Sequence, residues 1–184
     1  MMIRISHHTV RAVAPLNCFN LSWIKRVKFG RLLSEEDFLQ LKTWGREALS
    51  YQDFSFDAIT SVPSHPLRSL LEVDLAWEWA RCLEIVSETP LLSPGLRHRS
   101  LTHAVLRRPQ KTLSLSERRS HFVCPGRESR FQAPPLKVRR RVLLVDDVLS
   151  SGCSFLEATE ALEASGHQVV GGLVLAGRSC IRNL

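Results

Sequence analysis

The pattern of apolar and polar positions predicts that strands and helices alternate along the chain. After Ser34, whose hydroxyl can cap a helix, apolar side chains recur every three to four residues through about Leu49, as in an amphipathic helix. Residues 56–62 (FDAITSV) form a strand-sized run that stops at Pro63, which cannot donate to a ladder. Helical spacing returns between residues 68 and 85. A strand followed by a crossover helix favours a parallel sheet.

A second strand is predicted in the segment 142–154 (VLLVDDVLSSGCS), which begins with four consecutive apolar residues. Such a run is typical of a strand that is buried on both faces. Asp146 and Asp147 end it, and ligands of open α/β folds bind beyond the carboxyl ends of the strands. A helical pattern and another apolar run, residues 167–177, follow. We therefore expect an α/β fold with an open, mostly parallel twisted sheet flanked by helices.

The residues that follow the two acids are small, and several carry hydroxyl groups: Ser150, Ser151, Gly152, Cys153 and Ser154. They open the next predicted helix, where unpaired amides and a positive dipole end can hold a phosphate without lysine. Glycine at this point allows a close backbone approach. Carboxylates suited to sugar hydroxyls thus stand beside a phosphate loop, and a sugar phosphate fits both. The alternative is a buried strand whose acids only cap the next turn.

Composition and charge narrow the candidate partners. A chain of 184 residues that is 44% hydrophobic is long enough for one core, and no apolar run reaches the roughly 20 residues of a membrane span. The net charge of +7 is concentrated in the basic segment, residues 97–141, which holds 13 of the 25 Lys and Arg residues. Its acids are Glu117 and Glu128. An anionic partner is expected there, with no membrane partner.

The amino terminus and the cysteines indicate a cytoplasmic protein without a zinc site. The first 21 residues lack the continuous apolar stretch of a secretion signal. The five cysteines are scattered without a C-x-x-C pair or a neighbouring histidine at a ligand spacing, and we expect reduced, mostly buried thiols. They are Cys18, Cys82, Cys124, Cys153 and Cys180.

The segment 142–154 resembles the phosphoribosyl-diphosphate motif of type I phosphoribosyltransferases: an apolar strand, two acids, two spacers, then small hydroxyl residues around a glycine. The resemblance implies that Asp146 and Asp147 contact the ribose hydroxyls and that Ser150 to Ser154 bind the 5′-phosphate. It also implies Mg²⁺ held mainly through the substrate, without a direct protein ligand. A response-regulator receiver also has a strand that ends in acids, but only 37 residues follow Asp147, too few for its further βα units.

Three further stretches are similar to the ComF family of phosphoribosyltransferase-like proteins, associated with competence and DNA uptake: residues 24–30 (IKRVKFG), 57–68 (DAITSVPSHPLR) and 106–122. The resemblance implies a phosphoribosyltransferase-like domain over residues 24–184, after an N-terminal extension of residues 1–23. Glu72 to Ala76 stand where the family has Arg-Gly-Phe-Asn-Gln.

The same resemblance supplies further candidate substrate-binding residues. In related enzymes the loop after the first strand holds the diphosphate, which points to Ser61, Ser64, His65 and Arg68. Arg68 is a permanent cation, but a solvated helix start remains its alternative. A flexible hood over the substrate would use Arg107, Arg108, Gln110, Lys111 and Arg119, unless these are only surface charges. His98, His103 and His121 are candidate general acids, with inert surface histidines as the alternative.

Two functions follow as expectations. The first is transfer of a phosphoribosyl group from phosphoribosyl diphosphate, with Mg²⁺, to an unidentified acceptor. The second is a competence or DNA-uptake accessory role, in which the basic segment binds single-stranded DNA or a protein partner with little transferase activity. The aromatics of this segment, Phe122 and Phe131, are too few for a base-stacking platform. A nucleotide-binding regulator without turnover is a third option, and a homodimer is a further candidate assembly.

Overall fold

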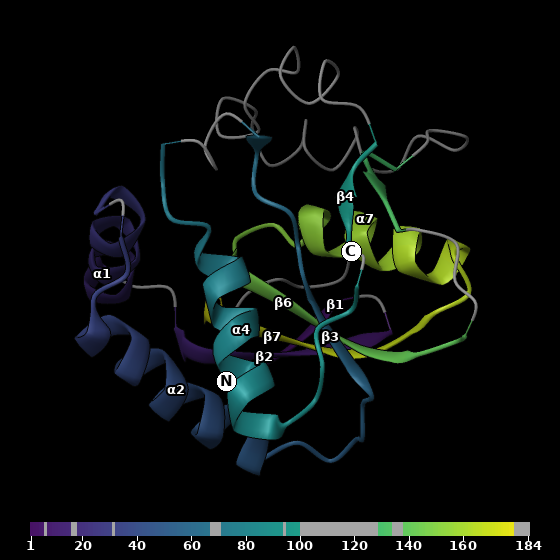
Figure 1. The fold of residues 1–184 in the computed structure, drawn as a ribbon, viewed down its shortest axis with the longest axis horizontal. Coiled ribbons are helices and arrows are strands. Elements are labelled where there is room, and N and C mark those ends of the chain that lie inside the picture. Colours follow the sequence, from purple (N-terminus) through teal and green to yellow (C-terminus); the bar gives the residue numbers. More distant parts are fainter. Residues whose placement is uncertain are drawn as a thin grey trace.

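The sheet at the centre of the molecule has five strands in the order β1-β2-β7-β6-β3 (Figure 1). The computed structural model describes residues 1–5, 7–15, 18–30, 32–66, 71–93, 95–99, 129–133 and 138–178. The strands are β1 (Met2–Ile5), β2 (His8–Pro15), β3 (Ala58–Ser61), β6 (Arg141–Leu149) and β7 (Gln168–Gly177). β1 and β2 are antiparallel, whereas the β2–β7, β7–β6 and β6–β3 pairs are parallel. The predicted open, mostly parallel sheet is confirmed.

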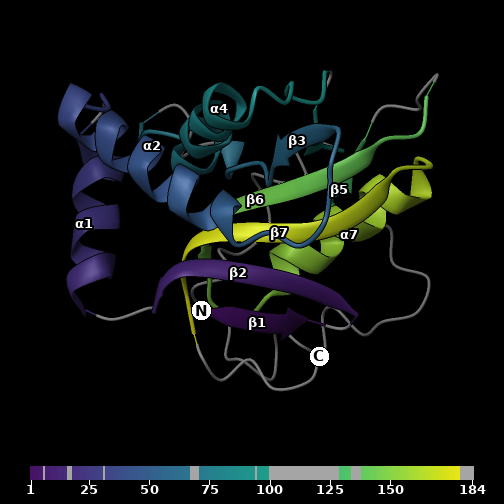
Figure 2. The ribbon, with the colours of Figure 1, turned by 90° about the horizontal axis from the view of Figure 1, so that it is seen from below.

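Helices cover both faces of this sheet, because its central strands are apolar on both sides (Figure 2). α1 (Cys18–Phe29), α2 (Glu35–Ser50) and α4 (Leu75–Ser87) pack on one face, where Leu143 and Val145 of β6 lie in their cluster. α7 (Cys153–Ala164) packs on the other, where Val142 and Leu144 share a cluster with its Phe155. The two faces therefore have separate apolar cores with β6 between them.

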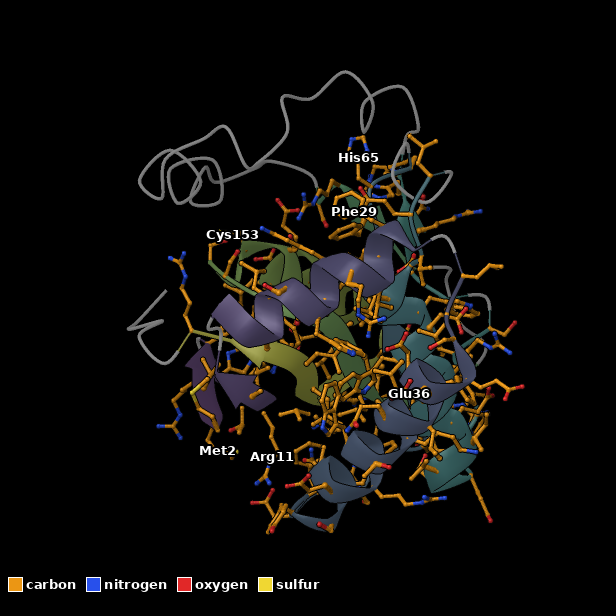
Figure 3. All side chains as sticks on the ribbon, turned by 90° about the vertical axis from the view of Figure 1, so that its left-hand side faces the viewer. Met2, Arg11, Phe29, Glu36, His65 and Cys153 are labelled. Atoms are coloured by element: carbon orange, nitrogen blue, oxygen red, sulfur yellow. The ribbon has the colours of Figure 1, made fainter. Side chains whose placement is uncertain are left out.

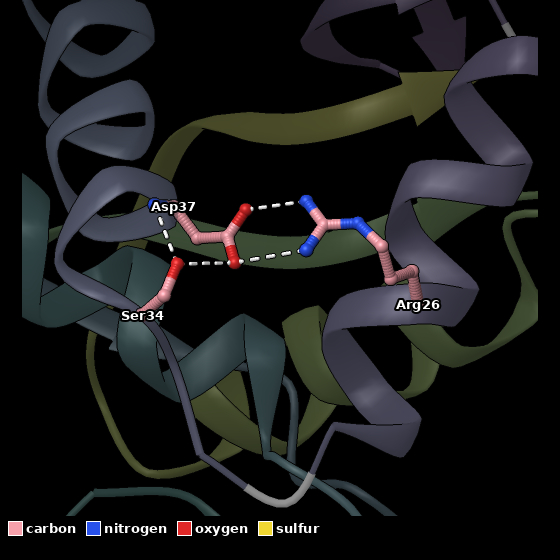
Figure 4. Close-up of polar contacts among 3 residues, drawn as sticks. All are labelled: Arg26, Ser34 and Asp37. Carbon is pink, nitrogen blue, oxygen red and sulfur yellow. Dashed lines mark hydrogen bonds and ion pairs between the residues drawn. The ribbon is translucent and has the colours of Figure 1, made fainter.

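The start of α2 is held by the cap that the sequence predicts (Figure 4). The Ser34 hydroxyl accepts a hydrogen bond from the Asp37 backbone N–H at 3.1 Å and donates to the Asp37 carboxylate at 2.7 Å. Arg26 of α1 donates to the same carboxylate at 2.6 Å. Burial opposes the ionisation of Asp37, but the hydrogen bonds from Arg26 and Ser34 outweigh it and lower its pKa. This contact fixes α1 against α2.

The predicted crossover helix forms, but it begins later than the apolar spacing indicates. α4 starts at Leu75, and the Asp74 side chain caps it by accepting a hydrogen bond from the Trp77 backbone N–H at 3.2 Å. Leu71, which fits the helical spacing, lies before the helix and is 71% exposed. The predicted helix start near residue 68 was wrong, because the side-chain cap at Asp74 sets the helix boundary and the apolar residues before it do not.

Residues assigned to the N-terminal extension contribute two strands to the central sheet. β2 pairs with β7 from Val10 opposite Gly172 to Pro15 opposite Gly177. The domain boundary after residue 23 stays a prediction. Within the basic segment, β4 (Arg97–His98) pairs with β5 (Phe131–Gln132) as a separate two-stranded sheet. Among the described helices, none has the length and apolarity that crossing a bilayer requires.

Candidate functional site

The carboxylate pair lies within β6 and not after its end, which corrects the predicted strand boundary. β7 runs alongside and supplies backbone partners as far as Leu149 opposite Gly177. β3, on the other side, pairs with β6 only as far as Ser61 opposite Val145. Asp146 is the next residue along β6. The acidic doublet, Asp146 and Asp147, therefore begins where the pairing with the shorter strand β3 has ended. Because β3 ends here, no described strand neighbours the two acids on that side of β6, at the carboxyl edge of the sheet where ligands of such folds bind.

The two carboxylates have different surroundings. Asp147 is only 8% exposed, and its carboxylate forms an ion pair with Lys28 of α1. Asp146 is half-buried, and its carboxylate accepts a hydrogen bond from the Asp147 backbone N–H at 2.8 Å. Burial raises the pKa of Asp146 to about 7, although the positive charges of Lys28 and Arg130 oppose this shift. Asp74 adds to it through its negative charge. Asp146 therefore titrates near neutral pH, where a bound cation would favour its charged form.

The segment after the acids starts a helix, as the sequence predicts. Gly152 is the N-cap of α7 and has a φ of 79°, a left-handed conformation that glycine adopts without strain. Gly152 has no side chain, so the N-cap residue itself makes no side-chain hydrogen bond to the helix. Gly152 and Cys153 are buried, and Ser150, Ser151 and Ser154 are half-buried. The start of α7 thus has the glycine, the hydroxyl groups and the positive dipole end that suit a helix N-terminus to an anion.

Arg130 brings a cation to this helix start from the basic segment. Its guanidinium donates to the Ser154 hydroxyl at 2.6 Å and forms an ion pair with Glu157, one turn into α7. It also lies over the Phe131 ring, 4.7 Å from the ring centroid. These contacts hold the guanidinium in one orientation. Ser154, Arg130 and the start of α7 thus form one hydrogen-bonded unit.

The loop after β3 approaches the site from the neighbouring strand. Ser61 is the last residue of β3 and is buried, and Ser64 and His65 are half-buried. His98 of β4 makes a 2.9 Å hydrogen bond between its Nε2 and the Ser64 carbonyl. Figure 3 shows His65 and Cys153 toward the same end of the molecule as Phe29, away from Met2. The structure therefore brings the β3 loop and the start of α7 to one end of the sheet.

Burial lowers the pKa of His98, and Arg130 and His65 lower it further by their charges, although the bond to Ser64 opposes the shift. The lowered pKa favours the uncharged ring at neutral pH, and the general-acid role of His98 stays a prediction. The remaining predicted residues of the site lie outside the described part of the chain, namely Arg68, His103, Arg107, Arg108, Gln110, Lys111, Arg119 and His121.

Three charged residues beside the doublet were not predicted from the sequence: Lys28, Asp74 and Arg130. Lys28 lies in the IKRVKFG stretch, whose likeness to a known family was a signal that the stretch had a role. Arg130 was counted only as one of the many cations of the basic segment. Asp74 is a helix cap, and only the fold brings it near Asp146. No sequence spacing relates these residues to β6.

The fold and the candidate site place this chain in a general class, the open α/β proteins that bind ligands beyond the carboxyl ends of parallel strands. Comparison with known proteins finds sequence similarity to a phosphoribosyltransferase over part of the chain. An adenine phosphoribosyltransferase of Polynucleobacter asymbioticus is 30% identical over 101 residues, which are 54% of this chain and 59% of the relative. The match thus spans little more than half of either protein. No family model matches the chain.

Among solved structures, an allosteric regulatory enzyme of purine biosynthesis aligns with a TM-score of 0.52 and 18% identity. The alignment covers 82% of this chain and 29% of that enzyme, so it shows a shared fold. UMP synthase of Leishmania donovani aligns with a TM-score of 0.45 and 19% identity, over 77% of this chain and 22% of the synthase.

Proposed function

We propose that this protein binds phosphoribosyl diphosphate with Mg²⁺ and transfers the phosphoribosyl group to an acceptor. One observation carries the proposal: an acidic doublet in a central strand is followed within a few residues by a helix that starts at a left-handed glycine flanked by hydroxyl residues. A ligand that combines sugar hydroxyls with a phosphate matches both halves of this arrangement. The sequence likeness to an adenine phosphoribosyltransferase supports it. A cytoplasmic location and membership of the ComF family are parts of the same proposal.

The phosphate end of the ligand would bind at the start of α7. The positive end of the α7 dipole is at this helix start, and Ser154 lies in its first turn. Arg130 adds positive charge, because its guanidinium contacts Ser154 directly. A doubly charged phosphate is thus met by hydrogen-bond donors and by one oriented cation.

The ribose would bind at the acidic doublet. Carboxylates accept hydrogen bonds from hydroxyls, and a negative charge stabilises the positive character that the anomeric carbon gains as its bond to diphosphate breaks. Diphosphate departs with the electron pair of that bond, and a nucleophilic atom of the acceptor forms the new bond. No protein nucleophile takes part, so the residues act by positioning and by charge.

The doublet also fits the Mg²⁺ that this chemistry implies. Mg²⁺ prefers oxygen ligands and keeps several waters, so one or two carboxylates and substrate phosphates suffice. Asp146 has a carboxylate whose pKa burial raises to about 7, and a nearby divalent cation would offset that cost. When bound, Mg²⁺ would neutralise charge on the diphosphate. Asp147 already has the Lys28 ammonium beside it, so Asp146 is the better placed of the two.

Lys28 has a specific place in this proposal. Its ion pair with Asp147 neutralises one carboxylate of the doublet, so the two acids do not face the ligand as a double negative charge. The ion pair also ties α1 to β6 at the candidate site. This contact supports a functional role for the stretch 24–30, which the family likeness singled out.

Calorimetry with phosphoribosyl diphosphate and Mg²⁺ tests the proposal, comparing the wild type with the double variant Asp146→Asn, Asp147→Asn. The exposed residue Asp53 provides the control variant Asp53→Asn. We expect saturable binding to the wild type and the control, and none to the double variant. Diphosphate release in the presence of adenine is the first assay for turnover, because the relative is an adenine phosphoribosyltransferase. Absence of binding to the wild type would refute the proposal.

The basic segment supports the second candidate function, binding of single-stranded DNA. Its 13 basic residues stand against two acidic ones, and most of it lies outside the described residues. Binding through phosphate contacts would weaken steeply as salt rises. A fluorescence titration with short oligonucleotides at several salt concentrations tests this. Affinity that is independent of salt, or absent at low salt, would exclude the DNA function.

A further inference from the structure

A second cluster of polar side chains lies away from the candidate site, where the β1–β2 hairpin meets the last turn of α7. His7 lies in the turn after β1, His8 is the first residue of β2, and Glu163 is next to the last residue of α7. Each offers one donor atom, and the three atoms lie within 4.8 Å of one another. The His8 Nε2 and the Glu163 Oε1 are 3.7 Å apart.

We propose that His7, His8 and Glu163 bind a divalent transition-metal ion such as Zn²⁺. Two imidazoles and a carboxylate are a donor set that Zn²⁺ accepts, and a water completes four-coordination. Tetrahedral geometry with bonds of about 2.0–2.1 Å needs donors about 3.3 Å apart. The His8–Glu163 separation is close to this value, and the exposed side chains of His7 and Glu163 have room to adjust.

His8 is the residue that makes this more than a chance grouping of surface side chains. It is only 6% exposed, and its Nε2 already faces the Glu163 carboxylate. Burial restricts the imidazole to few orientations, so one donor of the proposed site is already positioned. His7 packs against it, with ring centroids 3.9 Å apart.

A bound ion would join the N-terminal hairpin to α7. The hairpin is held to the sheet by β2–β7 pairing, whereas Glu163 lies at the opposite end of α7 from the candidate site. Metal binding to the folded chain would therefore raise its stability, by an amount that grows with the logarithm of the free ion concentration. Its effect would be on the fold and would not depend on the proposed transferase activity.

The test is calorimetric titration of metal-free protein with Zn²⁺, for the wild type and for His7→Gln and Glu163→Gln. Both substitutions are at exposed positions, and Glu160→Gln, at an exposed residue one turn earlier on α7, is the control. We expect one Zn²⁺ per chain in the wild type and the control, and at least about tenfold weaker binding in each variant. Thermal unfolding with saturating Zn²⁺ should show a rise in Tm for the wild type and the control only.

The absorption spectrum with Co²⁺ in place of Zn²⁺ identifies the donors. Nitrogen and oxygen ligation gives d–d bands without the near-ultraviolet charge-transfer band of a thiolate. A thiolate band, equal affinity in all four proteins, or no binding to the wild type would each overturn the proposal. Phosphoribosyl-diphosphate binding is also measured with the Glu163→Gln protein. This measurement distinguishes failure of the metal-site proposal from failure of the proposed function.

Discussion

The raised pKa of Asp146 predicts a stability cost that a single substitution should remove. Burial raises this pKa from 3.8 to about 7, so the folded protein holds the proton more tightly than the unfolded chain does. The protonated Asp146 carboxyl group therefore contributes fully to the free energy of unfolding below about pH 4, and this contribution is lost as the pH rises toward 7. Asp146→Asn removes the titrating group but keeps the oxygen that accepts the Asp147 backbone N–H. The variant should therefore lack this component of the pH dependence.

The size of the effect follows from the shift. Each pKa unit is worth about 1.4 kcal/mol, so the interval from pH 5 to 7 corresponds to at most about 3 kcal/mol. Asp146 is half-buried and lies near two cations, and solvent screening reduces this to about 2 kcal/mol. The wild type should thus lose about 2 kcal/mol more stability than Asp146→Asn between pH 5 and pH 8.

Urea unfolding of both proteins at pH 5 and pH 8 measures this difference, because other titrating groups contribute equally to both and cancel. Asp53→Asn, at an exposed position, should follow the wild type at both pH values. If the difference in unfolding free energy between wild type and Asp146→Asn is the same at pH 5 and pH 8, the reasoning about Asp146 is refuted.

Three further substitutions test other contacts. Lys28→Met leaves the buried Asp147 carboxylate without its cation and should lower the unfolding free energy by about 1–3 kcal/mol in urea titrations; an unchanged midpoint would contradict the ion pair. Gly172→Ala places a Cβ 2.4 Å from the Phe155 ring and should cost about 1–3 kcal/mol in the same assay, and a neutral result would mean that α7 is not packed this closely on β7. Arg130→Lys loses the planar fork that reaches two side chains of α7 and should weaken phosphoribosyl-diphosphate binding about tenfold by calorimetry with little change in stability; equal affinity would remove Arg130 from the site.

The sequence predicted the elements whose signals are local. The Ser34 cap with its acidic first turn set the start of α2, and the apolar run from Val142 predicted a buried strand. The small residues around Gly152 predicted the helix start after the acids. These signals lie within a few residues of the structure that they specify, so the expected order of strands and helices was confirmed.

Features that depend on pairing between distant segments could not be read in this way. The length of β6 beyond Asp146 depends on β7, which supplies backbone partners as far as Gly177. Lys28 comes from a segment more than 100 residues before the doublet. Arg130 lies 16 residues before Asp146 and acts on it by its charge. The strands of the N-terminal hairpin were missed because β2 pairs with β7, which lies far along the chain, and β1 joins the sheet only through β2.

The most direct test of the central claim is the electron density of crystals grown with phosphoribosyl diphosphate and Mg²⁺. We predict that the 5′-phosphate lies within about 3 Å of the amides at the start of α7, with the ribose hydroxyls against Asp146 or Asp147. Ligand density elsewhere on the molecule, with the start of α7 and the doublet unliganded, would contradict the account.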